Sequence, residues 1–262
     1  MRSRLVALLF SALFTPFILS AQTWVQTFPN TSVDDSTNMV SSADRYTISV
    51  RELSVPQTAR KSFDKGTRLL DGGNPAASIP EFQRAVAEYH FFAEAYYQLG
   101  RAQMTLGLAQ DATEAFSKAI EASDGRFALP YFALSMLLCQ QDKFAEGDTV
   151  AKTGLSLDPG SLTGQFSLGW AELGLGRVAI AEKTVREVLR RKANFRQARL
   201  LLVEIHRRTK DFPELLTDIE AYLKLDSSSP TSARLRALRE STLQSLAQSQ
   251  SNSSLVGRSS IN

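Results

Sequence analysis

The chain of 262 residues has few of the side chains that build reactive centres: one cysteine, Cys139, and two histidines, His90 and His206. A single cysteine excludes an intramolecular disulfide. These residues are also too few for a zinc site made of cysteine and histidine, so we expect neither a metal site nor a cofactor. Stability must therefore come from a packed core, in which we expect Cys139 to be a half-buried apolar residue.

Motifs of common enzyme classes are missing as well. The Gly72-Gly73 pair is typical of a hairpin turn rather than of a phosphate-binding loop, and no Gly-x-Ser-x-Gly motif is found. His90 falls in a predicted turn and His206 on a predicted helix with apolar neighbours, where partial packing explains it. We therefore predict no catalytic residues and no enzyme activity.

An excess of charge is lacking too. The chain has 30 basic and 27 acidic residues, a formal net charge of +3. Without Arg2 and Arg4, which lie in a segment that we expect to be removed, 28 basic residues face 27 acidic ones, a net charge of about +1. Such a balance is not typical of nucleic-acid binding.

The most prominent apolar run covers residues 5–19, is 15 residues long and contains Pro16. A helix that spans a bilayer needs about 20 residues, so a permanent anchor is not favoured. Arg2 and Arg4 precede the run and Ser20-Ala21 follows it, which is typical of a signal peptide over residues 1–21. We expect an exported protein, periplasmic or extracellular, that contacts a membrane only through this segment or the envelope. An uncleaved signal anchor is the alternative.

Residues 22–58 are predicted to form a flexible leader, because Ser, Thr, Asn and Asp dominate up to Asp44. Tyr46, Ile48 and Val50 then alternate with polar residues, which predicts one short strand before Pro56. This strand either packs along the first repeat, which we favour, or pairs with the sheet of a partner.

A self-similarity with a period of 34 residues runs from Ala59 to Ser229. We place five units at 59–92, 93–127, 128–161, 162–195 and 196–229. The second unit carries, in order, Tyr96, Leu99, Gly100, Gly107, Ala112, Phe116 and Ala119. In the fourth unit, the matching residues are Leu168, Gly169, Gly176, Ala181, Val185 and Val188. Beyond them, leucines at helical spacing predict a capping helix over 230–247, and the Ser-rich residues 248–262 predict a disordered tail.

This pattern resembles the tetratricopeptide repeat, with an aromatic-x-x-Leu-Gly start at Tyr96 to Gly100 and a closing proline at Pro159. The resemblance implies an all-α fold, a right-handed α-solenoid of five helical hairpins and a C-terminal capping helix. Together with the predicted signal peptide, it indicates an exported bacterial member of this family. Asn74, Asp142 and Asp211 are expected to cap the second helices of their hairpins.

The resemblance further implies that set positions of each first helix line a concave groove. The predicted groove residues are Phe63, Tyr97, Arg101, Phe132, Met136, Phe166, Trp170 and Leu200. Most are apolar, so they predict an apolar strip for a peptide, although aromatic residues on helices can equally belong to the core. The carboxylate clamp known in this family is absent, since Phe63, Thr67, Gln98, Leu129 and Ala133 occupy its positions.

Six arginines, close in sequence, form a predicted basic patch: Arg190, Arg191, Arg196, Arg199, Arg207 and Arg208. This patch would suit an anionic lipid, a polysaccharide or an acidic partner, while a solvated charged face is the plainer reading.

The sequence therefore predicts a non-enzymatic scaffold or adaptor that binds a peptide or protein segment in its groove, in the cell envelope. One alternative is a self-associating structural component of an envelope assembly. Another is binding of an anionic surface through the basic patch, which raised salt would weaken.

Overall fold

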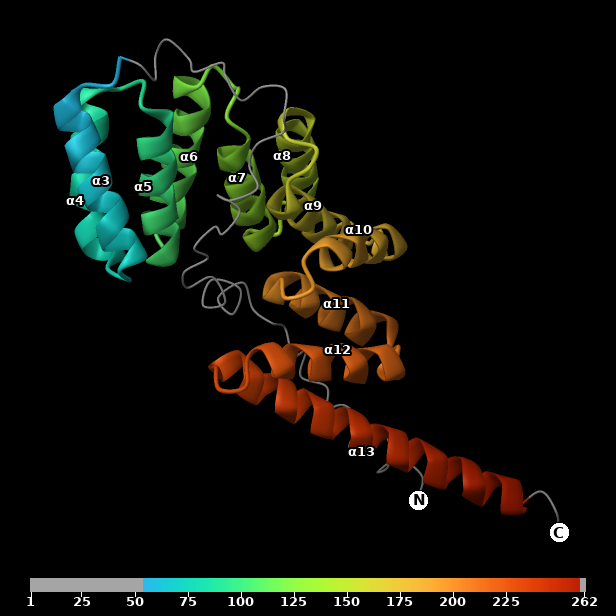
Figure 1. Ribbon diagram of the computed structural model, residues 1–262. Helices are drawn as coiled ribbons and strands as arrows, with labels where there is room; N and C mark the ends of the chain where they lie inside the picture. The colour runs from blue at the N-terminus through green and yellow to red at the C-terminus, as the bar shows by residue number, and fades with distance from the viewer. Residues whose placement is uncertain (1–53, 260–262) are drawn as a thin grey trace, which may run out of the picture. The chain divides into compact units, whose positions relative to one another are not determined.

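The computed structural model describes residues 54–259, with side chains up to residue 248 (Figure 1). Within this range all regular structure is helical, so the predicted all-α fold of helical hairpins is confirmed. The predicted signal peptide and the strand at Tyr46–Val50 lie outside the described residues. The chain divides into two compact units, Met1–Glu114 and Ala115–Asn262, which are described separately below.

Unit 1 contains the first hairpin, α3 (Gln57–Asp71) and α4 (Pro75–Glu88), followed by α5 (Ala93–Thr105) and the start of α6 (Ala109–Ala122). Helix α4 packs against both α3 and α5.

Unit 2 begins within α6 and continues with three hairpins and one long helix. The hairpins are α7 (Ala128–Gln140) with α8 (Phe144–Leu157), α9 (Leu162–Gly174) with α10 (Val178–Arg191), and α11 (Arg196–Thr209) with α12 (Phe212–Leu225). Each helix from α7 to α12 packs against the next one. No helix within the described range is both long and apolar enough to cross a membrane.

One turn conformation recurs between the two helices of each hairpin. A residue with positive φ occupies the same place in all five turns: Gly73, Gly107, Asp142, Gly176 and Lys210. The predicted caps Asn74 and Asp211 are confirmed, since they accept hydrogen bonds from Ala77 N at 3.2 Å and Glu214 N at 3.3 Å. The predicted cap at Asp142 is wrong, because this residue holds the left-handed place in the turn and Lys143 precedes α8.

Lys210→Gly is expected to stabilise the chain by about 1 kcal/mol, because Lys210 has φ 59° and glycine removes the cost of a Cβ in this conformation. Urea unfolding of the variant and the wild type measures the difference. Lys224→Gly is the contrasting control, since this residue lies inside α12 and the change should destabilise by about 1 kcal/mol. An unchanged midpoint of urea unfolding for Lys210→Gly would contradict the expected backbone strain at Lys210.

Helices pack closely, both within a hairpin and between neighbouring hairpins, by placing an aromatic ring against glycine. The Phe132 ring of α7 occupies the space beside Gly154 of α8 and Gly164 of α9, where an added Cβ would lie 2.5 Å from Phe132 Cε1 in each case. Phe82 lies over Gly66 in the first hairpin in the same way. The glycines thus allow an aromatic ring to lie against the backbone of a neighbouring helix.

Gly169→Leu is expected to destabilise unit 2 by about 1–3 kcal/mol, because a Cβ at this position would lie 2.9 Å from Val185 Cγ2. Thermal unfolding followed by circular dichroism measures the loss. Gly160→Leu is the control, since the nearest atom to its added Cβ is Asp158 Oδ1 at 3.5 Å. Equal melting of the two variants would contradict close packing of α9 on α10.

The C-terminal helix α13 (Pro230–Ser259) is longer than the capping helix predicted over 230–247. It packs against α12 and buries Ser232, Leu235 and Thr242. The helix extends over most of the range 248–262, for which the sequence predicts a disordered tail. A physical reason is that no proline occurs after Pro230, and serine and glutamine are tolerated in helices.

The outer face of α3 is charged. Interior first helices bury small or apolar residues on the corresponding face, as α11 does with Ala198, Leu202 and Ile205. The corresponding positions of α3 are Lys61, Lys65 and Arg68, and all three are exposed. Polar outer faces are typical of terminal repeats, because another hairpin stacked there would bury these charges.

Candidate protein-binding surface and the buried polar network

The structure places most of the predicted groove residues in the core. Phe132, Phe166 and Leu200 are at most 2% exposed. Tyr97, Met136 and Trp170 are buried as well, and Phe63 is half-buried. The expectation of an open apolar strip is therefore wrong for these side chains, and the alternative that they belong to the core describes them better.

The contacts of these rings explain their burial. Phe132 fills the space left by Gly154 and Gly164. Phe166 packs edge-on against Phe195 with ring centres 5.6 Å apart, and Phe63 lies 4.9 Å from Phe92. Because Phe195 and Phe92 begin the next hairpin, this helix position joins neighbouring repeats instead of facing a ligand.

Arg101 is the predicted groove residue that keeps a polar group at the surface of α5. Its side chain is half-buried, and Nη1 donates a hydrogen bond to Gln98 Oε1 at 2.7 Å. The guanidinium carbon also lies 6.0 Å from the centre of the Tyr97 ring. These two contacts restrict the side chain, so its position is largely fixed before any partner binds.

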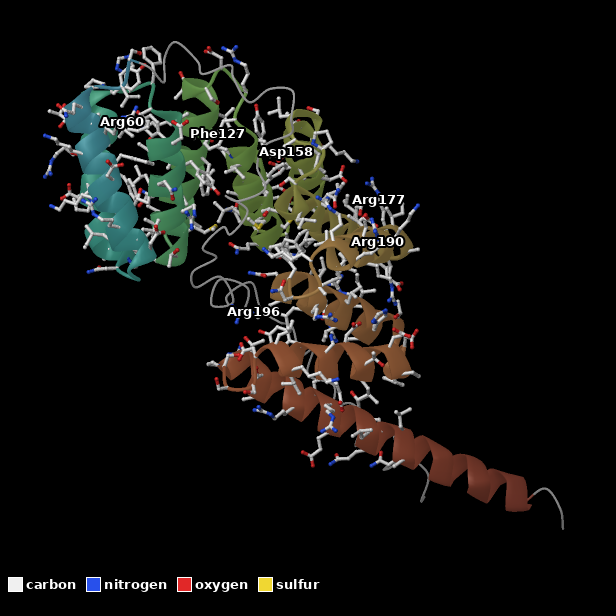
Figure 2. All side chains as sticks on the ribbon, in the orientation of Figure 1. Arg60, Phe127, Asp158, Arg177, Arg190 and Arg196 are labelled. Carbon is white, nitrogen blue, oxygen red and sulfur yellow. The ribbon has the colours of Figure 1, made fainter. Side chains whose placement is uncertain are left out.

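Four of the six arginines of the predicted basic patch pair with nearby carboxylates, and Figure 2 labels two of them, Arg190 and Arg196. Arg190 pairs with Glu187 at 2.6 Å, and Arg196 with Asp226 at 3.5 Å. Arg207 and Arg208 both pair with Glu204, at 2.8 and 2.6 Å. In addition, Arg199 donates to the backbone oxygen of Ala193. Local carboxylates thus neutralise much of this charge, which weakens the case for an anionic surface as partner.

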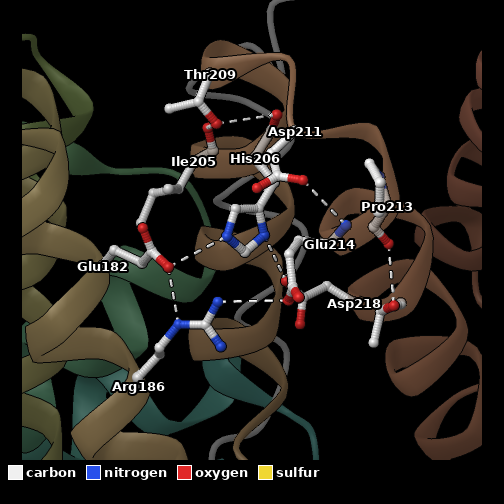
Figure 3. Close-up of polar contacts among 10 residues, drawn as sticks. Glu182, Arg186, Ile205, His206, Thr209, Asp211, Pro213, Glu214 and Asp218 are labelled. Carbon is white, nitrogen blue, oxygen red and sulfur yellow. Dashed lines mark hydrogen bonds and ion pairs between the residues drawn. The ribbon is translucent and has the colours of Figure 1, made fainter.

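Sequence reasoning missed a polar network, centred on the buried His206 and Asp218, that joins α10, α11 and α12 (Figure 3). His206 of α11 is 2% exposed. Its Nδ1 lies 2.8 Å from Asp218 Oδ2 of α12, and its Nε2 lies 3.5 Å from Glu182 Oε1 of α10. Arg186 donates to the same Glu182 oxygen at 2.8 Å and pairs with Glu214 at 3.4 Å. One imidazole thus connects three helices.

Burial and charge act differently on the two carboxyl groups beside His206. Burial raises the pKa of Asp218, and the charge and hydrogen bond of His206 oppose that change. At Glu182 the hydrogen bond from Arg186 is the main cause of a lowered pKa. The two acids therefore differ because Asp218 is enclosed, whereas Glu182 is nearer to solvent and to a guanidinium.

Comparing equivalent positions of neighbouring hairpins gives a sequence signal for this network. His206 and Asp218 are 12 residues apart, on the two helices of one hairpin. The hairpin before it has Glu172 and Thr184 at the same spacing, and Thr184 Oγ1 donates to Glu172 Oε2 at 3.0 Å. Polar residues at both of these positions therefore indicate a hydrogen bond inside the hairpin.

The histidines are placed poorly for catalysis. His206 is enclosed and both of its nitrogens face carboxylates, so a substrate has no access to them. His90 is exposed in the loop after α4, where its ring lies 4.2 Å from that of Phe91. Across residues 54–259, no group of three or more His, Cys, Asp or Glu side chains could hold a metal ion.

Cys139 is expected to react slowly with thiol reagents in the folded chain. It is buried on α7 against Gly147 of α8, and burial raises the pKa of its thiol to about 12. Since the thiolate is the reactive form, we expect labelling by Ellman's reagent at pH 8 to be at least ~100-fold slower than in 8 M urea. Equal rates would mean that the hairpin of α7 and α8 opens readily.

Comparison with known families agrees with the repeat architecture. The family model described as tetratricopeptide repeat matches residues 63–126 and 166–230. A curated relative, the heat shock protein STI1 of Saccharomyces cerevisiae, is 31% identical over 115 residues. That match covers 44% of this chain and 20% of the yeast protein, so the chain corresponds to a fifth of the length of this relative.

Solved structures share the fold. The tetratricopeptide-repeat protein TTC0263 of Thermus thermophilus superposes with a TM-score of 0.59 at 22% identity, covering 71% of this chain and 99% of that one. YrrB, a repeat protein described as having an unusual peptide-binding site, gives a TM-score of 0.50 at 13% identity, covering 68% and 92%. At these identities the likeness concerns the fold alone.

Proposed function

Because the chain belongs to the tetratricopeptide-repeat family, we propose that it is a non-enzymatic scaffold that binds a protein or peptide segment along the first helices of its hairpins. The observation that carries this proposal is the stack of matched hairpins, whose cores are filled by their own side chains. Helices stacked in this way within each unit present an extended surface, which suits the binding of a segment rather than chemistry.

Arg101 is the side chain on which we centre the contact. It lies on the first helix of its hairpin, and Gln98 and Tyr97 hold it in place. The positive charge of a guanidinium held in this way attracts a carboxylate. We therefore expect the bound segment to carry an acidic side chain or a C-terminal carboxylate near Arg101.

Display of a random peptide library on the immobilised chain tests the proposal, followed by calorimetry of the enriched peptides. Arg101→Glu is expected to weaken binding at least ~10-fold, since it replaces an attractive charge with a repulsive one. The matched control is Lys61→Glu, which makes the same charge change on the outer face of α3. Equal affinities of both variants, or a library without enriched peptides, would overturn the proposal.

We also propose that the protein works in the cell envelope, from the basic start, apolar run and small-residue end of residues 1–21. Isolation from cell fractions and N-terminal sequencing test this part separately. A chain that starts at Gln22 in the periplasm or medium is expected, whereas a chain that starts at Met1 in the cytosol would refute export.

A further inference from the structure

Glu172 of α9 is a buried acid without a basic partner among the described residues. Its side chain is 6% exposed, and Thr184 Oγ1 of α10 donates a hydrogen bond to its Oε2 at 3.0 Å. Every other buried acid in this range lies within ion-pair distance of a lysine, an arginine or a histidine: Glu81, Asp148, Glu204 and Asp218. A carboxylate that is enclosed without a cation has a large desolvation cost, so burial favours the neutral acid at Glu172.

The surroundings of Glu172 connect two hairpins. The backbone N–H of Arg177 donates to the backbone oxygen of Glu172 at 2.9 Å, and the guanidinium of Arg177 pairs with Asp148 Oδ1 of α8 at 3.3 Å. The Phe144 ring, at the start of α8, fills the space beside Gly174, two residues after Glu172. Glu172 is therefore part of the joint between the hairpin of α7 and α8 and the hairpin of α9 and α10.

The helices that pack on α9 bring few groups that could balance a charge on Glu172. The charged and titratable groups near it are Asp148 and Lys152 of α8, Arg177 before α10, Arg208 of α11 and Cys139 of α7. Each of the three cations pairs with another acid, at 2.6 to 3.3 Å. Burial raises the pKa of the thiol to about 12, so the thiol stays protonated at neutral pH. Within the described part of the chain, ionised Glu172 would thus have no cation of its own.

The electrostatic surroundings give the sign of the pH dependence. Burial is the main cause of a raised pKa at Glu172; the hydrogen bond from Thr184 opposes this change, and the charge of Asp148 adds to it. A glutamate whose pKa is raised by folding stabilises the folded chain most at a pH below its unfolded-state pKa of about 4.3, and this stabilisation disappears as the pH passes the folded-state pKa. The joint should therefore be tighter in mild acid than at alkaline pH.

We propose that Glu172 makes the joint between these two hairpins sensitive to pH. While the acid is neutral, α9 stays packed against α8 and α10. When the acid loses its proton, the buried charge loosens α9 from both helices. This device acts within unit 2, so it does not depend on the peptide contact at Arg101 and is independent of the proposed function.

Hydrogen exchange of the full-length chain, followed by mass spectrometry at pH 5 and pH 8, tests the proposal. Wild type and Glu172→Gln are compared at the same pH, so the pH dependence of the exchange chemistry itself cancels. At pH 8 we expect the amides of α9 to exchange at least ~5-fold faster in the wild type, because glutamine cannot ionise. At pH 5 the two chains should exchange at the same rate, since glutamine resembles the neutral acid in shape and in hydrogen bonding.

Glu204→Gln is the matched control. It makes the same change at an acid of α11 that is also 6% exposed but pairs with Arg207 and Arg208. Because two ion pairs are lost, the amides of α11 should exchange faster in this variant than in the wild type at pH 8, which is the opposite direction. Equal exchange of α9 in the wild type and Glu172→Gln at pH 8, or a difference of the same size at both pH values, would overturn the proposal.

Thr184→Val provides a second test that keeps the acid. It removes the hydrogen bond that Glu172 accepts, which favours the ionised form, so the exchange of α9 should become faster by a larger factor at pH 8 than at pH 5. Circular dichroism at both pH values checks that each variant is folded. An effect of Thr184→Val that does not change with pH would contradict a role for the charge of Glu172.

Discussion

Phe132→Ala is expected to destabilise the chain by about 3–5 kcal/mol, because it leaves a ring-sized cavity between α7, α8 and α9. Phe132 is fully buried, and Gly154 and Gly164 provide no side chain that could fill the space. Urea unfolding at 25 °C measures the change. Phe91→Ala is the matched control, since it removes the same ring from a site that is 41% exposed and should cost much less.

This result distinguishes a core role from a groove role for the aromatic position. If Phe132 lay on the floor of an open groove, its truncation would weaken peptide binding and leave the unfolding midpoint near the wild-type value. The structure leads us to expect the reverse order, with lost stability as the primary effect. A folded Phe132→Ala variant of wild-type stability would contradict the packing of Phe132 against Gly154 and Gly164.

The helical repeat could be predicted from sequence because its determinants are local. Gly73, Gly107 and Gly176 recur at the 34-residue period, and glycine is the residue that best tolerates their positive φ. Asp142 and Lys210 occupy the same place without being glycine. A search for glycine therefore misses these two turns, whereas the spacing of the repeats locates them. The period therefore predicts the turn better than the residue type does.

The aromatic residues could not be assigned to core or groove from the first helix alone. A side chain at this helix position reaches toward the next hairpin, and whether it is enclosed depends on what lies opposite. For Phe132 the deciding residues are Gly154 and Gly164, which are 22 and 32 residues further along the chain. Pairing large residues with glycines about one repeat away would have predicted the burial of this ring.

The contacts of charged side chains also differ in whether sequence spacing alone predicts them. Glu187 with Arg190 and Glu204 with Arg208 are three and four residues apart, so helix geometry alone predicts these ion pairs. The contact between His206 and Glu182 spans two hairpins, and sequence spacing gives no direct rule for it. A density of arginine in sequence is thus a poor measure of positive surface charge.

His206→Leu is expected to destabilise unit 2 by about 3–5 kcal/mol, because it leaves the carboxyl group of Asp218 buried without its partner. Leucine has a volume similar to that of histidine, so the loss reflects the missing contact more than a cavity. Thermal and urea unfolding measure it, with His90→Leu as the control at an exposed histidine. Removing both members in His206→Leu/Asp218→Ala should cost less than the sum of the single changes by roughly 1–3 kcal/mol.

The cost of His206→Leu should also depend on pH. Burial raises the pKa of Asp218 and His206 opposes this, so the variant is expected to raise that pKa further. A carboxyl group whose pKa is raised in the folded state contributes most to stability at a pH below its unfolded-state pKa of about 3.9. This contribution is lost as the pH rises through the pKa of the group in the folded state. The variant should therefore lose less stability at pH 4 than at pH 7. A cost that is the same at both values, or additive changes in the double variant, would mean that His206 stabilises α11 through packing and not through its contact with Asp218.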